Sequence, residues 1–184
     1  MNNMEKIYTL SVLVDSEPGV LSQVSRMFTR KGYNIESLAV GTTHDPTISR
    51  MTIEIKTTKD KAELTCNQVR KLLPVHSVKL LSRDEAIKRE LLMIKLATKD
   101  SLERNEIMQI ANIFRASVID VSTSSITLAV IGDAEKNAAI ESLLEHCRIM
   151  ELVRTGIVAL ERGTATIDED TKEKGEFDYG KNVL

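Results

Sequence analysis

The sequence predicts an α+β fold of two successive ferredoxin-like units followed by a flexible C-terminal tail, and three observations support this. Strand and helix periods alternate in the order β-α-β-β-α-β over about 77 residues, which is the order of a ferredoxin-like unit. The same order then repeats, and Met27-Phe28 and Ile113-Phe114 end the first helix of each repeat. Residues 164–184 are charged and poor in apolar side chains, as expected of a tail that stays mobile or orders on a partner.

The first unit, residues 1–82, has four predicted strands and two predicted helices. The first helix should include Pro18, which suits a first helical turn because its missing N–H has no partner there, and should stop before Gly32. Strand 48–56 alternates apolar and polar residues, so one sheet face should be buried and the other should face water. The predicted elements are strands 6–14, 34–42, 48–56 and 75–82 and helices 18–31 and 59–73.

The second unit, residues 83–163, begins with a charged connector at 83–89. Its first turn, Lys99-Asp100-Ser101-Leu102, lacks the Pro-Gly pair of the first unit, so the two turns should not bind the same ligand. The predicted elements are strands 90–97, 117–123, 125–132 and 149–160 and helices 101–115 and 134–147.

The composition is that of a soluble globular protein. The chain has 184 residues, 42% of them hydrophobic, and its net charge of −2 argues against a nucleic-acid-binding surface. We find neither a signal sequence nor an apolar run of about 18 residues, so we expect a cytoplasmic protein. Cys66 and Cys147 should be small core residues of predicted helices, and His44, His76 and His146 are isolated, so no metal site is expected.

No group of residues in the sequence predicts catalysis. The sequence contains no G-x-S-x-G nucleophile motif, no P-loop and no G-x-G-x-x-G after a strand. The acidic run 168–170 lies in the tail, and Glu36 and Glu54 lie on predicted strands where they should face water. These features favour a binding or regulatory module over an enzyme.

The turn between the first strand and the first helix is the best candidate for a binding site. The N–H groups at a helix start attract an anion such as a carboxylate, and Gly19 would let it approach the backbone closely. Asp15 could pair with an ammonium group and Asn34 offers an amide, so these residues could hold a free amino acid. If two sheets paired edge to edge at this site, binding of the amino acid would be coupled to association of the two units. The alternative, which these residues alone favour, is a plain turn with Asp15 or Ser16 as the N-cap.

Runs in both units resemble one known family. The run SVLVDSEPGVLSQVSRMFTRKGYNIESLAVG at 11–41, followed by DPTISRMTI at 45–53, closely resembles the N-terminal ACT domain of the acetolactate synthase (acetohydroxyacid synthase) small, regulatory subunit. IFRASVIDVS at 113–122 and ELVRTGIVALERG at 151–163 are similar to the second domain of that family. The resemblance spans residues 6–163 and leaves the tail outside.

The resemblance implies a subunit without chemistry of its own. Members of this family raise the activity of a catalytic subunit that condenses pyruvate with a second 2-oxo acid. Thiamine diphosphate, magnesium and FAD are expected on that catalytic subunit only. The small subunits also confer feedback inhibition by valine, and in some members by leucine or isoleucine. They form a homodimer through their ACT domains and bind the effector at the interface.

Carried over to this sequence, the resemblance places the effector between the turn of one chain and the second strand of its partner. The residues from the turn are Asp15, Ser16, Glu17, Pro18, Gly19, Val20 and Leu21, with Ser22 behind them. Asn34 and Ile35 would come from the partner chain. Many members carry Asn at the position of Ser16, which is shorter and has one donor, so the preferred effector of this chain can differ from theirs.

Two other functions are compatible with the order of the elements. A free-standing double-ACT amino-acid sensor would act on a different partner, and co-purification with a large thiamine enzyme would separate the two hypotheses. RNA-binding RRM domains share the β-α-β-β-α-β order, but they stack bases on aromatic side chains of the central strands. Strand 48–56 presents Met51, Ile53 and Ile55 instead, and the pI is about 6.0, so the sequence does not favour RNA.

Overall fold

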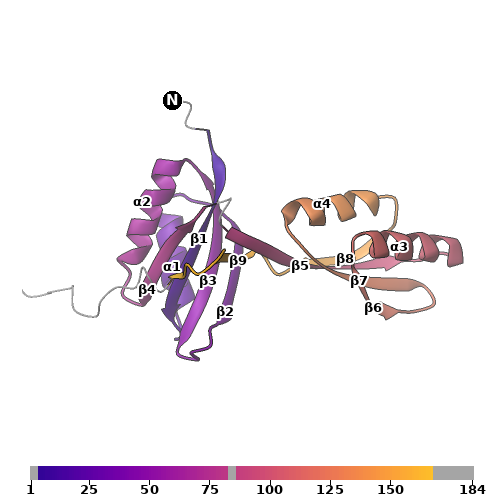
Figure 1. The fold of residues 1–184 in the computed structure, drawn as a ribbon, viewed down its shortest axis with the longest axis horizontal. Helices are drawn as coiled ribbons and strands as arrows, with labels where there is room; N and C mark the ends of the chain where they lie inside the picture. Colours follow the sequence, from indigo (N-terminus) through magenta and orange to yellow (C-terminus); the bar gives the residue numbers. More distant parts are fainter. Residues whose placement is uncertain (1–3, 83–85, 168–184) are drawn as a thin grey trace, which may run out of the picture. The chain divides into compact units, whose positions relative to one another are not determined.

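The computed structural model describes residues 4–82 and 86–167, which form two compact units (Figure 1). The first unit comprises the described residues up to Ile87 together with residues 159–167, and the second comprises Lys88–Val158. Each unit contains an antiparallel sheet and two helices, which confirms the predicted α+β fold of two ferredoxin-like units. The predicted tail lies outside the described residues from position 168 onward.

The first unit has the four strands and two helices that the sequence predicts. Its sheet has the order β2-β3-β1-β4, so β2 and β4 are edge strands. One face carries the aliphatic core, in which Leu10 and Val12 of the central strand pack with Phe28 of the first helix. The elements are β1 (Lys6–Asp15), α1 (Val20–Arg30), β2 (Ile35–Thr42), β3 (Ile48–Thr57), α2 (Lys59–Arg70) and β4 (Val75–Leu81).

The second unit repeats this arrangement with the sheet order β6-β7-β5-β8, and β9 pairs with β5. Its core is again aliphatic, with Leu92, Ile94 and Leu96 of β5 fully buried. The elements are β5 (Ala86–Ala97), α3 (Ser101–Ile113), β6 (Ser117–Val121), β7 (Ser125–Gly132), α4 (Ala134–Leu143) and β8 (Ile149–Arg154). Strand β9 (Val158–Glu161) and the first two residues of β5 fall mostly within the first unit, which resumes at Ala159.

Several predicted boundaries are wrong. Helices α2 and α4 end at Arg70 and Leu143, each before the last apolar residue of its predicted stripe. Strand β5 starts at Ala86, inside the segment predicted to be a charged connector. The predicted strand 149–160 is two strands, because Gly156 has a φ of +79° and a residue with positive φ cannot continue an extended strand. Apolar periodicity therefore located the elements but not their ends.

The prediction that Glu54 faces water is wrong. Glu54 is only 9% exposed, and its carboxylate accepts a hydrogen bond from the Thr9 hydroxyl at 2.8 Å. On this polar face of the sheet the Ser77 hydroxyl donates to the carbonyl of Ile167 at 2.7 Å, so the segment 159–167 crosses it (gold in Figure 1). Alternating polarity showed which side of the strand lacks the aliphatic core, but it could not show that a distant segment covers that side.

Two further findings concern the described residues as a whole. In the part of the chain that the structure describes, no helix has the length and apolar character needed to cross a membrane. Within the same residues, no group of three or more His, Cys, Asp and Glu side chains lies close enough to hold a metal ion.

Candidate functional site

The loop between β1 and α1 is held at two points by neighbouring segments. The N–H of Asp15 donates to the carbonyl of Pro74 at 2.8 Å, which ties the end of β1 to the turn before β4. The N–H of Ser16 donates to the carbonyl of Thr47 at 2.8 Å, which ties the next residue to the loop between β2 and β3. The start of the loop therefore has a defined backbone position before any ligand binds.

Gly19 is the N-cap of α1, so the prediction that Pro18 belongs to the first helical turn is wrong. Gly19 has a φ of +90°, in the left-handed region that favours glycine, and no side chain caps the helix. The alternative interpretation, with Asp15 or Ser16 as the N-cap, is therefore also wrong. The first helical hydrogen bond runs from the N–H of Gln23 to the carbonyl of Gly19, so the preceding N–H groups have no helical acceptor.

The space around Gly19 is open. A Cβ atom built on this residue would meet no heavy atom within 4 Å. Ser16, Glu17, Pro18 and Leu21 are also exposed, and Leu21 is 45% exposed, whereas Val20 turns into the core at 4%. An uncapped and accessible helix start is a suitable seat for a carboxylate.

Asp15 contacts His76, which lies 61 residues away in the sequence. The distance from His76 Nε2 to Asp15 Oδ1 is 2.6 Å, and the two side chains are 25% and 41% exposed. Nearby, hydrogen bonds from the hydroxyl and the N–H of Thr47 hold the pKa of Asp45 below its usual value, and His44 and His76 act in the same direction. The end of the sheet that bears the loop therefore combines two carboxylates with two imidazoles.

Ser16 is held by Ser49 on β3. The Ser49 hydroxyl donates to the Ser16 oxygen at 3.1 Å. The Ser16 hydroxyl therefore acts as an acceptor in this contact and keeps its own hydrogen for a second partner. Ser16 thus keeps a donor beside the open helix start.

Asn34 and Ile35 lie at the other end of the sheet from Asp15. Ile35 pairs with Ile55, which pairs with Tyr8, whereas Asp15 pairs with Ile48. Tyr8 and Asp15 are seven residues apart on β1, which corresponds to about 24 Å of strand. The Asn34 amide instead donates to Glu36 Oε1 at 3.0 Å. One chain therefore does not bring together all the residues that the sequence assigned to the site.

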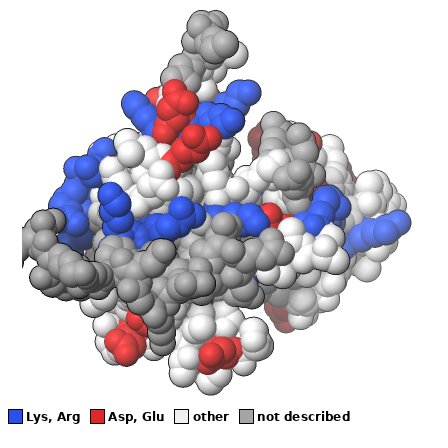
Figure 2. Space-filling model, turned by 60° about the vertical axis from the view of Figure 1, so that its left-hand side comes forward, with Lys and Arg blue, Asp and Glu red and all other residues white. Residues whose placement is uncertain are grey.

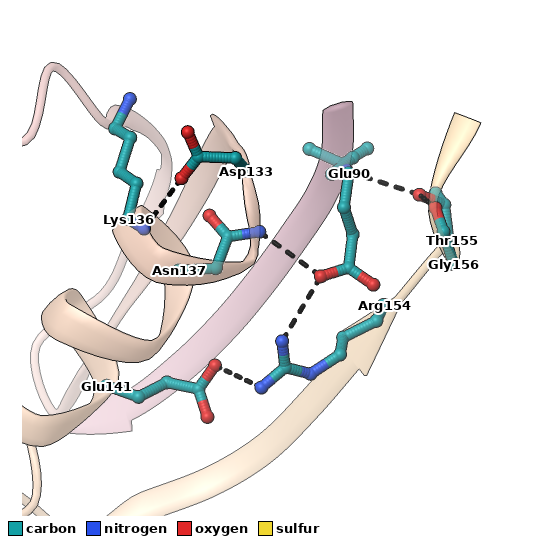
Figure 3. Close-up of polar contacts among 9 residues, drawn as sticks. Glu90, Asp133, Lys136, Asn137, Glu141, Arg154, Thr155 and Gly156 are labelled. Carbon is teal, nitrogen blue, oxygen red and sulfur yellow. Dashed lines mark hydrogen bonds and ion pairs between the residues drawn. The ribbon is translucent and has the colours of Figure 1, made fainter. Parts of the chain in front are cut away.

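The second unit contains a polar cluster that sequence reasoning missed (Figure 3). Glu90 on β5 is 8% exposed at its side chain, and it accepts hydrogen bonds from Arg154 Nη1 at 3.2 Å and Asn137 Nδ2 at 3.3 Å. Arg154 also forms an ion pair with Glu141 of α4. The cluster joins β5, α4 and the end of β8, and the only signal for it was a carboxylate at the start of an apolar strand.

The two cysteines are buried core residues. Burial raises the pKa of Cys66 to about 11, and burial also raises the pKa of Cys147. Cys66 lies on α2 as predicted, whereas Cys147 lies beyond the end of α4 and still packs into the second core. His146, next to Cys147, has its Nε2 3.2 Å from Glu106 Oε1.

Charged side chains are exposed on the α2 side of the first unit. Figure 2 brings this side forward and shows both basic and acidic side chains at the surface. Lys59, Lys61 and Lys71 are exposed cations of α2 and its C-terminal end, and Lys59 is paired only weakly with Glu63 at 3.8 Å.

Comparison with known families matches both units. Residues 10–77 match a family described as the AHAS small subunit-like ACT domain. Residues 89–163 match a family described as the small subunit of acetolactate synthase. The two matches together cover most of the chain, and each falls on one of the repeated β-α-β-β-α-β patterns.

Similar proteins carry the same description. The chain is 41% identical over 163 residues to the acetolactate synthase small subunit of Mycolicibacterium smegmatis, covering 89% of this chain and 95% of the relative. It is 42% identical over 160 residues to a probable acetolactate synthase small subunit of Methanothermobacter thermautotrophicus, covering 87% and 95%. The crystal structure of the acetolactate synthase small subunit from Thermotoga maritima superposes with a TM-score of 0.81 at 33% identity, covering 87% of this chain and 99% of that one.

Proposed function

Because this chain belongs to the acetolactate synthase small-subunit family, we propose that it confers feedback inhibition by a branched-chain amino acid, most simply valine. The catalytic subunit of acetolactate synthase is the partner that would be inhibited. The observation that carries this proposal is the open, uncapped start of α1 at Gly19. The helix start can bind an anion such as the carboxylate of an amino acid. The strand that precedes it ends at the Asp15 carboxylate, which can bind the ammonium group of the same molecule.

The amino acid would bind through three kinds of contact. Its carboxylate would accept hydrogen bonds from the N–H groups of Leu21 and Ser22, which precede the first helical hydrogen bond. Its ammonium group would meet the Asp15 carboxylate, and the Ser16 hydroxyl would donate to a carboxylate oxygen. Burying an isopropyl group is worth about 1.5–3 kcal/mol, so discrimination between valine and its homologues should be modest.

A second copy of this chain would complete the site. Strand β2 lies at the edge of its sheet and carries the apolar residue Val40, whose side chain is 48% exposed. Antiparallel pairing of two β2 strands about a two-fold axis at Leu38 would place the partner's Asn34 level with Thr42. Thr42 pairs with Ser49, next to the residue that pairs with Asp15. This register therefore brings the partner's Asn34 to the end of the sheet that bears the loop.

We place the chemistry of the complex on the catalytic subunit. The family resemblance implies that thiamine diphosphate, magnesium and FAD belong there. Binding of an amino acid at a seam between two small subunits would favour one dimer geometry over others, and the catalytic subunit would respond to that geometry.

Calorimetric titration with valine, leucine and isoleucine tests this function. We would titrate the full chain alone and again after adding the catalytic subunit, and we would measure inhibition of the assembled enzyme in parallel. We expect saturable binding of at least one of the three, with matching inhibition. Absence of binding and of inhibition in both preparations would refute the proposal, and failure to co-purify with the catalytic subunit would favour a free-standing sensor.

A further inference from the structure

His76 is placed beside the proposed effector site by a break in the pairing of β4. Leu13 pairs with Ser77 and Val14 pairs with Val75, so His76 has no counterpart on β1 and is the extra residue of a β-bulge. A bulge turns its extra side chain away from the regular alternation, and such features occur next to functional sites. Here the imidazole turns toward the last residue of β1, whose carboxylate lies 2.6 Å from Nε2.

We propose that His76 is a positioning residue for Asp15 and makes binding of the amino-acid effector in this loop dependent on pH. The inference rests on the proposed function, because it assigns Asp15 to the ammonium group of the effector. It adds a residue that belongs neither to the turn nor to the partner strand.

The hydrogen-bond chemistry sets the direction of the effect. An ionised carboxylate only accepts hydrogen bonds, so His76 Nε2 carries the hydrogen that lies toward Asp15. A neutral imidazole makes this bond and leaves the full negative charge of Asp15 for an ammonium group. A protonated imidazole neutralises that charge and repels the ammonium group. Because imidazoles change charge between pH 5 and 8, affinity for the effector should fall as the pH falls through this range.

Other titratable groups lie near His76, and their effects on binding must be distinguished from the effect of His76. Asp45 and His44, on the loop between β2 and β3, interact electrostatically with this end of the sheet. Asp45 has a lowered pKa and therefore keeps its charge over the whole range. His44 is the second group that can change charge, and Lys71 is the nearest cation along the chain before His76. Among these groups, His76 is the one whose side chain contacts the Asp15 carboxylate directly, at 2.6 Å.

The test measures the Kd for valine on the full chain at pH 5.5 and pH 8.0. We expect binding to weaken about fivefold to tenfold at pH 5.5 in the wild type, within the usual range of coupling between two sites. His76→Gln keeps a hydrogen-bond donor but cannot gain charge, so its Kd should stay constant within a factor of about two. His44→Gln is the matched control, because it removes a nearby imidazole without touching Asp15, and it should retain the wild-type dependence.

Each outcome decides between the two proposals. Loss of the pH dependence in His76→Gln alone supports the role of His76. Valine binding that is independent of pH in the wild type, or a dependence that His76→Gln retains, overturns the role of His76 while the effector site stands. Absence of saturable binding by the wild type at either pH, with the catalytic subunit present, overturns both. Thermal unfolding at both pH values checks that each variant is folded.

Discussion

Replacing Gly19 by Asp is the sharpest test of the effector site, because Gly19→Asn is an almost isosteric control. Both side chains tolerate a left-handed backbone better than other non-glycine residues, and both carry the strain of a φ near +90°. Neither Cβ atom would clash with the protein, since nothing lies within 4 Å of that position. The two variants therefore differ mainly by one negative charge at the proposed carboxylate seat.

The size of the charge effect follows from the geometry. A carboxylate on residue 19 would lie about 5–6 Å from the carboxylate of a bound amino acid, and an effective dielectric constant of 20–40 makes the repulsion about 1.5–3 kcal/mol. This corresponds to a loss of affinity of roughly 10-fold to 150-fold. The backbone strain of about 1 kcal/mol is common to both variants and cancels when they are compared.

Two assays measure this difference. Calorimetry would give the Kd for valine of Gly19→Asp, Gly19→Asn and the wild type, and inhibition of the assembled enzyme would give the functional consequence. The excess loss in Gly19→Asp should shrink as salt is raised, because ions screen exposed charges. Equal affinities for Gly19→Asp and Gly19→Asn at low salt would show that no carboxylate binds at this helix start.

Three further predictions concern other parts of the chain. Asn34→Ala should weaken valine binding about 10-fold, because the effector would lose one hydrogen bond. The Tm should not fall, because Asn34 is exposed. A Tm decrease of many degrees would instead make the role of Asn34 structural. Arg154→Ala should lower the free energy of unfolding by about 2–3 kcal/mol, because the variant leaves the Glu90 carboxylate buried without its cation. Glu141→Gln removes the more exposed ion pair and should change the free energy of unfolding by less than about 1 kcal/mol. Equal effects of the two variants in urea unfolding would contradict this difference. Burial raises the pKa of Cys66 to about 11, so the folded state resists ionisation of this thiol. The resulting stability is present below pH 9 and is lost as the pH rises from 9 to 11. Over this range the urea midpoint of Cys66→Ala should fall less than that of the wild type.

The elements of both units were predictable because local periodicity records which face of a helix or strand is apolar. The stripe of α1 appears in the structure as the buried residues Val20, Val24, Met27 and Phe28. The ends of the helices were less predictable, because apolar residues of the same stripe can stay buried when the backbone has already left the helix. Gly19 shows this best: its sequence context allowed a turn with a side-chain cap, and the backbone instead uses glycine itself as the N-cap.

The sequence alone determined the two-unit fold, the aliphatic cores, the family and the segment that forms the loop. The tertiary structure alone decided which distant residues meet there. His76 reaches Asp15 only because a bulge shifts the register of β4, and Asn34 is excluded from the same end because β2 starts at the opposite end of the sheet. Segment 159–167 covers a polar face in the same way, through contacts far apart in sequence. Periodicity is a property of neighbouring residues, whereas register and chain return are set by packing over the whole unit.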